Sequence, residues 1–170
     1  LDDADDLRAW LELPPDTDPG AFQAEKIIDV EEQLGDSGIV MLGTADPICI
    51  LAQLFDMGEF TIVAMTEQDL VHRALRRFFD EIMAKVEIVA AALPGRLWRI
   101  AGPEYATPPY LPPNLFYDYV TEYVKPMVEA IHKHGGYARV HCHGNIAQAL
   151  PHIAETGCMG LDPIEAPPQG

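Results

Sequence analysis

Two histidines, His141 and His143, flank a single cysteine in the segment Val-His-Cys-His-Gly-Asn at residues 140–145. Side chains alternate along a strand, so the two imidazoles are expected on one face and Cys142 on the other. Two imidazoles at this spacing can share one metal ion, and a catalytic zinc usually has three protein ligands. The spacing therefore predicts a divalent-metal site that needs a third ligand. The alternatives are two histidines hydrogen-bonded at a loop mouth, or two histidines that bind an anionic substrate.

Acidic and aromatic residues near other predicted strand ends are further candidates. Glu165 follows the last predicted strand and is either a zinc ligand or a solvated acid. Asp46, in the Gly-Thr-Ala-Asp-Pro turn, either contacts substrate or caps the next helix. The proline-rich loop 102–112 carries Glu104 and Tyr105 and is either a substrate-binding loop or a stiff connection. We expect this loop on the same rim as the histidines, with Glu104 or Tyr105 facing the mouth.

Strand and helix signals alternate along most of the chain. Strands are predicted near 38–42, 97–101, 137–142 and 159–164, with helices at 48–57, 67–93, 113–134 and 145–156, after acidic helices at 2–12 and 19–34. This order predicts an α/β fold with parallel pairing. Four such units are about half of a (β/α)8 TIM barrel, and an open doubly wound sheet is the alternative. We therefore expect residues 1–170 to be one partial barrel domain, truncated at both ends.

Composition limits the partners and the compartment. The chain has 170 residues and a net charge of −16, from 11 Lys and Arg against 27 Asp and Glu, which disfavours nucleic acid and anionic membranes. No secretory signal or membrane-length apolar run is visible, and three cysteines without a CxxC motif favour a reducing cytoplasm. The open edges of half a barrel favour pairing with another chain, as in a homodimer.

Three stretches of the sequence resemble the uroporphyrinogen decarboxylase superfamily, which includes cobamide-dependent methyltransferases acting on coenzyme M or other thiols. They are residues 43–47, 102–131 and 132–165. In the methyltransferase branch the corresponding strand ends in His-x-Cys-Gly-Asn, whose His and Cys bind zinc. Here His141 matches the His, Gly144 and Asn145 match the tail, and His143 replaces the Cys. That replacement leaves zinc binding open, because imidazole also binds zinc.

The resemblance implies a (β/α)8 fold and a zinc-dependent methyltransferase that moves a methyl group from a methyl-corrinoid donor to a thiol or similar acceptor. Its partners would be a small-molecule substrate and a corrinoid protein. The alternatives are a cofactor-free uroporphyrinogen decarboxylase of porphyrin and heme biosynthesis, or a non-catalytic corrinoid-binding relative. The residues expected to carry the activity are His141, His143 and Glu165 as metal ligands, Asn145 at the cofactor, and Asp46, Glu104 and Tyr105 in catalysis.

Overall fold

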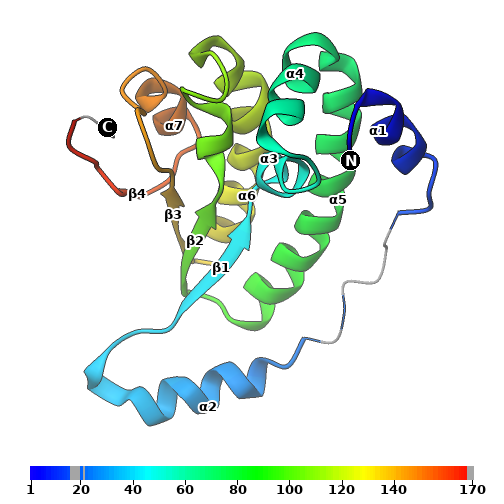
Figure 1. Cartoon of the computed structure of the whole chain (residues 1–170). Helices are drawn as coiled ribbons and strands as arrows, with labels where there is room; N and C mark the ends of the chain where they lie inside the picture. The colour runs from blue at the N-terminus through cyan, green and yellow to red at the C-terminus, as the bar shows by residue number, and fades with distance from the viewer. Residues whose placement is uncertain (16–19, 21, 168–170) are drawn as a thin grey trace.

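The computed structural model describes residues 1–15, 20 and 22–167, and its centre is a four-stranded parallel sheet (Figure 1). The strands are β1 (Met41–Ala45), β2 (Leu97–Ala101), β3 (Tyr137–His141) and β4 (Gly160–Asp162), in the order β1-β2-β3-β4. A doubly wound sheet would reverse its strand order at a switch point, whereas a barrel keeps the order of the chain. The predicted α/β fold with parallel barrel units is therefore confirmed, and the doubly wound alternative is not.

The two faces of the sheet differ in burial. Leu42, Trp98, Ile100 and Val140 point to one face and are at most 8 % exposed. The residues between them point to the opposite face and are less buried; Arg139 on β3, for example, is only partly buried. In a complete α/β sheet both faces are covered. Here one face packs against helices and the other is partly open, which agrees with a partial barrel.

The crossover from β1 to β2 contains three helices: α3 (Pro47–Ala52), α4 (Met57–Thr66) and α5 (Gln68–Ala92). The predicted helix 48–57 is too long, because Leu54 and Phe55 donate backbone hydrogen bonds three residues back and close a turn. Sequence reasoning missed α4 altogether. Apolar residues lie on all its sides, with Phe60 buried and Ile62 exposed, so it shows no single apolar stripe.

The long helix α5 agrees with its prediction. Its apolar residues recur at steps of three and four, and they are buried against the body of the protein: Val71, Leu75, Phe78, Ile82 and Val86. The helix packs against α3 and α6 (Glu122–Lys133). This buried face anchors the first crossover and holds the end of β1 in place.

The predicted helix 113–134 is divided into segments. It begins with short turns, η3 (Pro113–Leu115) and the π-helical η4 (Tyr117–Thr121), and continues as α6. Pro126 lies inside α6, where it lacks an N–H and crowds the carbonyl four residues earlier. The π turn just before that point is a local irregularity of the kind expected next to a helix proline. The second crossover therefore exists as predicted, with an irregular start.

The remaining helices are peripheral. They are α1 (Ala4–Leu11), α2 (Ala24–Leu34) and α7 (Leu150–Glu155). The first packs on α5, and α2 lies below the amino ends of the strands in Figure 1. Glu31 of α2 forms a bidentate ion pair with Arg96, at 3.0 and 2.7 Å. The predicted helix 19–34 begins too early, because residues 20, 22 and 23 are not helical, and residues 19 and 21 fall outside the described residues. The predicted helix 145–156 is also too long, because only Leu150–Glu155 is helical.

The sheet is not closed: within the described residues, β1 and β4 each pair on one side only. No described helix combines the length and apolar character that a membrane span requires. The open edges agree with the expected half barrel, and the homodimer inferred from them stays a prediction.

Candidate functional site

The two histidines lie together at the carboxyl end of β3. Their ring centroids are 4.7 Å apart and the ring planes are nearly perpendicular, at 87°. Cys142 between them is completely buried, while His141 is partly buried and His143 is exposed. The predicted alternation of side chains is therefore confirmed. The carboxyl ends of parallel strands are where enzymes of this architecture place their chemistry.

A carboxylate on the neighbouring strand holds His141. Asp162 at the end of β4 is in register with His141, and its Oδ2 accepts a hydrogen bond from Nδ1 at 2.7 Å. The other oxygen, Oδ1, lies 2.8 Å from Nε of Arg139. Sequence reasoning missed Asp162. Its signal, a carboxylate at the end of the next parallel strand, becomes visible only once the register of β3 and β4 is known.

A second carboxylate holds His143. Oε1 of Glu165 accepts from His143 Nδ1 at 3.1 Å, and Oε2 accepts from the backbone N–H of Gly144 at 2.5 Å. The Gly144 N–H and then His143 lower the pKa of Glu165. Both oxygens are thus engaged with N–H donors. In this structure Glu165 orients a histidine, which differs from the direct metal ligand that the sequence suggested.

The histidine pair meets only part of the requirement for a metal site. An ionised carboxylate can only accept, so each Nδ1 carries the proton and each neutral ring keeps its lone pair on Nε2. Metal-bound histidines are commonly held in this way through their second nitrogen. No group of three or more His, Cys, Asp or Glu side chains suited to a metal occurs in residues 1–15, 20 and 22–167. These residues therefore offer two candidate ligands, His141 and His143, and no third.

The proline-rich loop lies on the same rim. A side chain added at Gly144 would place its first carbon 3.7 Å from Pro108 O and from Thr107 Oγ1. The predicted proximity of loop and histidines is therefore confirmed. The Tyr105 ring packs against Phe60, with centroids 6.5 Å apart, and lies 6.1 Å from the ring of Tyr110.

Asn145, the residue expected at a cofactor, is exposed beside Gly144 on the same rim. Its role there stays a prediction.

Asp46 lies at the end of β1 and is 0 % exposed. Its Oδ1 accepts a hydrogen bond from the Cys49 N–H at 2.8 Å, so Asp46 is the N-cap of α3, one of its two predicted roles. Burial, and then the charge of Glu104, raise the pKa of Asp46 well above its ordinary value. Burial also raises the pKa of the Cys49 thiol to about 12 and that of Cys142 still further. Burial therefore favours the protonated form of both thiols.

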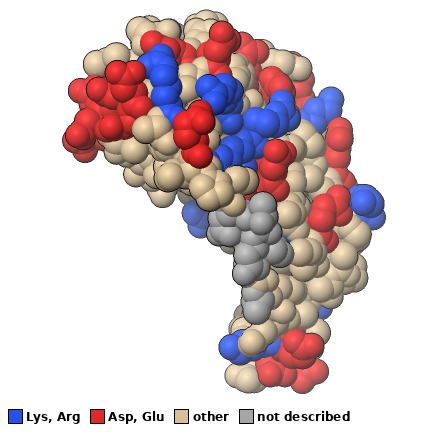
Figure 2. Space-filling model, turned by 90° about the vertical axis from the view of Figure 1, so that its right-hand side faces the viewer, with Lys and Arg blue, Asp and Glu red and all other residues tan. Residues whose placement is uncertain are grey.

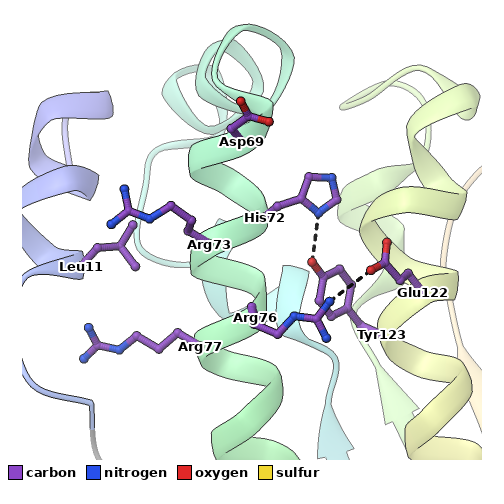
Figure 3. Close-up of a pocket in the computed structure, with 8 residues that line it drawn as sticks. All are labelled: Leu11, Asp69, His72, Arg73, Arg76, Arg77, Glu122 and Tyr123. Carbon is purple, nitrogen blue, oxygen red and sulfur yellow. Dashed lines mark hydrogen bonds and ion pairs between the residues drawn. The ribbon is translucent and has the colours of Figure 1, made fainter.

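A second cluster of ionisable residues occupies a groove on the helical side, with a volume of about 660 Å³. Arginines of α5 meet acidic residues on this face (Figure 2). In Figure 3, Arg73 and Arg77 point toward α1, while His72 and Arg76 point toward α6. Arg76 pairs with Glu122 at 3.1 Å.

Arg77 closes the α1 side of this groove. It donates to the carbonyls of Trp10, Leu13 and Pro14 and covers the Trp10 ring at 4.1 Å. These contacts attach the end of α1 to α5, so the groove has a structural explanation and contains none of the predicted site residues.

The parallel sheet, its sequential strand order and the polar residues at its carboxyl edge define a protein of the (β/α)-barrel class. The family model of uroporphyrinogen decarboxylase (URO-D) matches residues 3–167, which is nearly the whole chain. The protein therefore belongs to the uroporphyrinogen decarboxylase superfamily, most of whose members are enzymes. No curated protein matches the chain.

Proposed function

We propose that this protein is a metal-dependent methyltransferase of the superfamily, with a divalent metal, zinc, bound through Nε2 of His141 and His143. One observation carries the proposal: each of the two neighbouring imidazoles has its Nδ1 held by a carboxylate, at 2.7 and 3.1 Å. That arrangement fixes the tautomer needed for metal binding at Nε2. The third ligand would come from outside the described residues, or from the acceptor substrate.

The chain's own residues would prepare this site. Asp162 and Glu165 keep the proton on Nδ1 of each ring and set the ring orientations. Bound metal would lower the pKa of a thiol acceptor, as it does for coordinated thiols in general. A methyl-corrinoid would supply the methyl group, while His141 and His143 would hold the metal that activates the acceptor sulfur. We also propose a corrinoid protein as partner and the cytoplasm as location, since all three cysteines are free.

A specific observation supports tetrapyrrole decarboxylation as a second candidate. Arg139 precedes His141 by two residues on β3 and its Nε lies 2.8 Å from Oδ1 of Asp162, and such a cationic group can bind substrate carboxylates. This function needs no metal, so it does not require the third ligand that the described residues lack. The net charge of −16 argues against it, because a polyanionic substrate would be repelled.

The metal content of the purified protein separates the two candidates. We expect near-stoichiometric zinc in the wild type and loss of zinc in His141→Ala and in His143→Ala. His152→Ala is the matched control, because His152 lies on α7 and pairs with Glu155 instead. In Asp162→Asn, zinc affinity should fall about 10- to 100-fold, since only an orienting group is weakened. Absence of zinc from the wild type, with activity intact in chelator, would reject the metal site and favour the decarboxylase.

A further inference from the structure

Two carboxyl groups under the proline-rich loop each have an oxygen without a partner. Asp46 is fully buried, and its Oδ2 has no hydrogen-bond partner among the described residues. Glu104, in the short helix η2 (Pro103–Ala106) that follows β2, is half-buried, and its Oε2 is likewise buried without a partner in that part of the chain. Leaving such an oxygen without a hydrogen bond costs about 1–3 kcal/mol, so the presence of two of them, on Asp46 and Glu104, needs an explanation.

The topology brings the two groups into one small region. The ends of β1 and β2 are neighbours, and the Asp46 N–H donates to the Ala101 carbonyl at 3.0 Å. A first side-chain carbon at Gly102 would lie 2.9 Å from Asp46 Oδ1, so the Asp46 carboxyl rests against the backbone two residues before Glu104. The negative charge of Glu104 acts on Asp46 and also on the thiols of Cys49 and Cys142. The four groups therefore lie close enough together for the charge of Glu104 to act on the other three, and two of them, Asp46 and Cys142, are fully buried.

The surroundings of this cluster favour one neutral acid. The titratable groups facing Asp46 are the Cys49 thiol from α3, the Glu104 carboxyl from η2 and the Cys142 thiol after β3, and none of them is cationic. Two like charges in such a place cannot both be ionised cheaply. A protonated carboxyl, in contrast, has an O–H that can donate to the oxygen of its neighbour. One shared proton would therefore provide a partner for both orphaned oxygens.

We propose that Asp46 and Glu104 form a proton-sharing carboxyl pair that serves as the internal acid–base group of this site. Methyl transfer to a thiol releases one proton, and decarboxylation takes one up. In the first case the S–H bond breaks and its proton moves to the ionised member of the pair; in the second the protonated member gives its proton to the carbanion. Glu104 belongs to the loop whose Thr107 and Pro108 reach Gly144, next to the two histidines.

The role of the Asp46–Glu104 pair in turnover rests on the proposed function. The sharing of a proton between the two carboxyls is independent of that function. A carboxyl-carbon NMR titration tests the shared proton directly. We expect Asp46 to titrate well above pH 4 in the wild type, and its midpoint to fall in Glu104→Gln, because a neighbouring negative charge is removed. Glu59→Gln is the matched control, because Glu59 is exposed on α4 and should leave Asp46 unchanged. An ordinary Asp46 midpoint, or one that Glu104→Gln does not move, would overturn the pair.

A rate measurement tests the use of the proton. With methylcobalamin as the donor and a simple alkanethiol as the acceptor, Glu104→Gln should shift the pH–rate profile of kcat while KM for the thiol changes less than twofold. An unchanged profile in an active enzyme would reject the role of the pair in turnover. A protein that shows the coupled titration but no methyl transfer would retain the pair and reject the methyltransferase assignment.

Discussion

The arginine groove on α5 and the carboxyl-end rim of the sheet both concentrate ionisable side chains, but they differ in how those side chains are paired. In the groove, Arg76 faces Glu122, and both terminal nitrogens of Arg77 donate to carbonyls. Its Nε has no hydrogen bond in the described chain but lies 3.6 Å from the Glu81 carboxylate. At the rim, the histidines are paired through one nitrogen each, while Asp46 and Glu104 keep buried oxygens without partners in the described chain. In a cluster with a structural role, charged side chains have hydrogen-bond or ion-pair partners. Buried polar groups without partners are typical of functional sites.

The largest expected effect tests how tightly the rim is built. Gly102 has φ +119°, and a methyl group there would lie 2.1 Å from Cys49 Cβ. Gly102→Ala should therefore lower the free energy of unfolding by about 3 kcal/mol or more, measured by urea denaturation. Gly43→Ala on β1 is the control, because no atom lies within 4 Å of its added carbon. A Gly102→Ala protein as stable as the control would show that the rim is loosely packed.

The next effect tests the structural role of the groove. Arg77 is 14 % exposed and donates to three carbonyls near the end of α1. Arg77→Ala should cost about 1.5–3 kcal/mol of stability, because one half-buried and two exposed carbonyls lose a charged donor. Arg73→Ala should change stability by less than about 0.5 kcal/mol, since its ion pair to Glu12 is exposed and 3.9 Å long. Equal losses in both variants would contradict the distinction drawn between these arginines.

A smaller effect concerns the sign of the pH dependence at Asp46. Its pKa is raised on folding, so the folded protein binds a proton more tightly than the unfolded chain. That contribution is complete below about pH 4, the unfolded value, and is lost as the pH rises through the raised pKa. Asp46→Asn should lack this loss and be about 1 kcal/mol more stable than the wild type at alkaline pH.

Thermal unfolding of both proteins across a pH series measures this difference. Asp46→Ala should be less stable at every pH, because it removes the cap of α3 as well as the ionisable group. A stability difference between wild type and Asp46→Asn that does not vary with pH would contradict the raised pKa.

The smallest effect has the opposite sign and concerns Glu165. Its pKa is lowered on folding, first by the Gly144 N–H and then by His143. Its contribution is therefore present above about pH 4.3, the unfolded value, and is lost as the pH falls through the lowered pKa. As the pH falls, the free energy of unfolding should drop slightly less in Glu165→Gln than in the wild type. In the control Glu129→Gln, whose side chain is exposed, it should drop as in the wild type. If both variants lose stability at low pH as the wild type does, the ionisation of Glu165 does not contribute to stability in this way.

Much of the architecture could be predicted from the sequence because local patterns determine it. Steps of three and four from Val71 to Val86 predicted the buried face of α5, and short apolar runs next to glycine or proline predicted the strands. The first strand was placed three residues too early, at 38–42, whereas β1 is Met41–Ala45. The helix α4 was missed because its apolar residues surround it on all sides. The start of the 113–134 helix was simplified, since a π turn depends on how the segment packs and has no sequence period of its own.

For the site, the sequence alone determined which side chains could meet: the alternation of a strand put His141 and His143 on one side, and the strand–loop order put Glu104, Asp46 and Glu165 at one rim. Only the tertiary structure decided their partners. Asp162 reaches His141 through the register of β3 and β4, and Glu165 orients His143 through both of its oxygens. These pairings depend on the lateral pairing of distant segments, and hydrogen bonds across 21 or 22 residues leave no local pattern in the sequence.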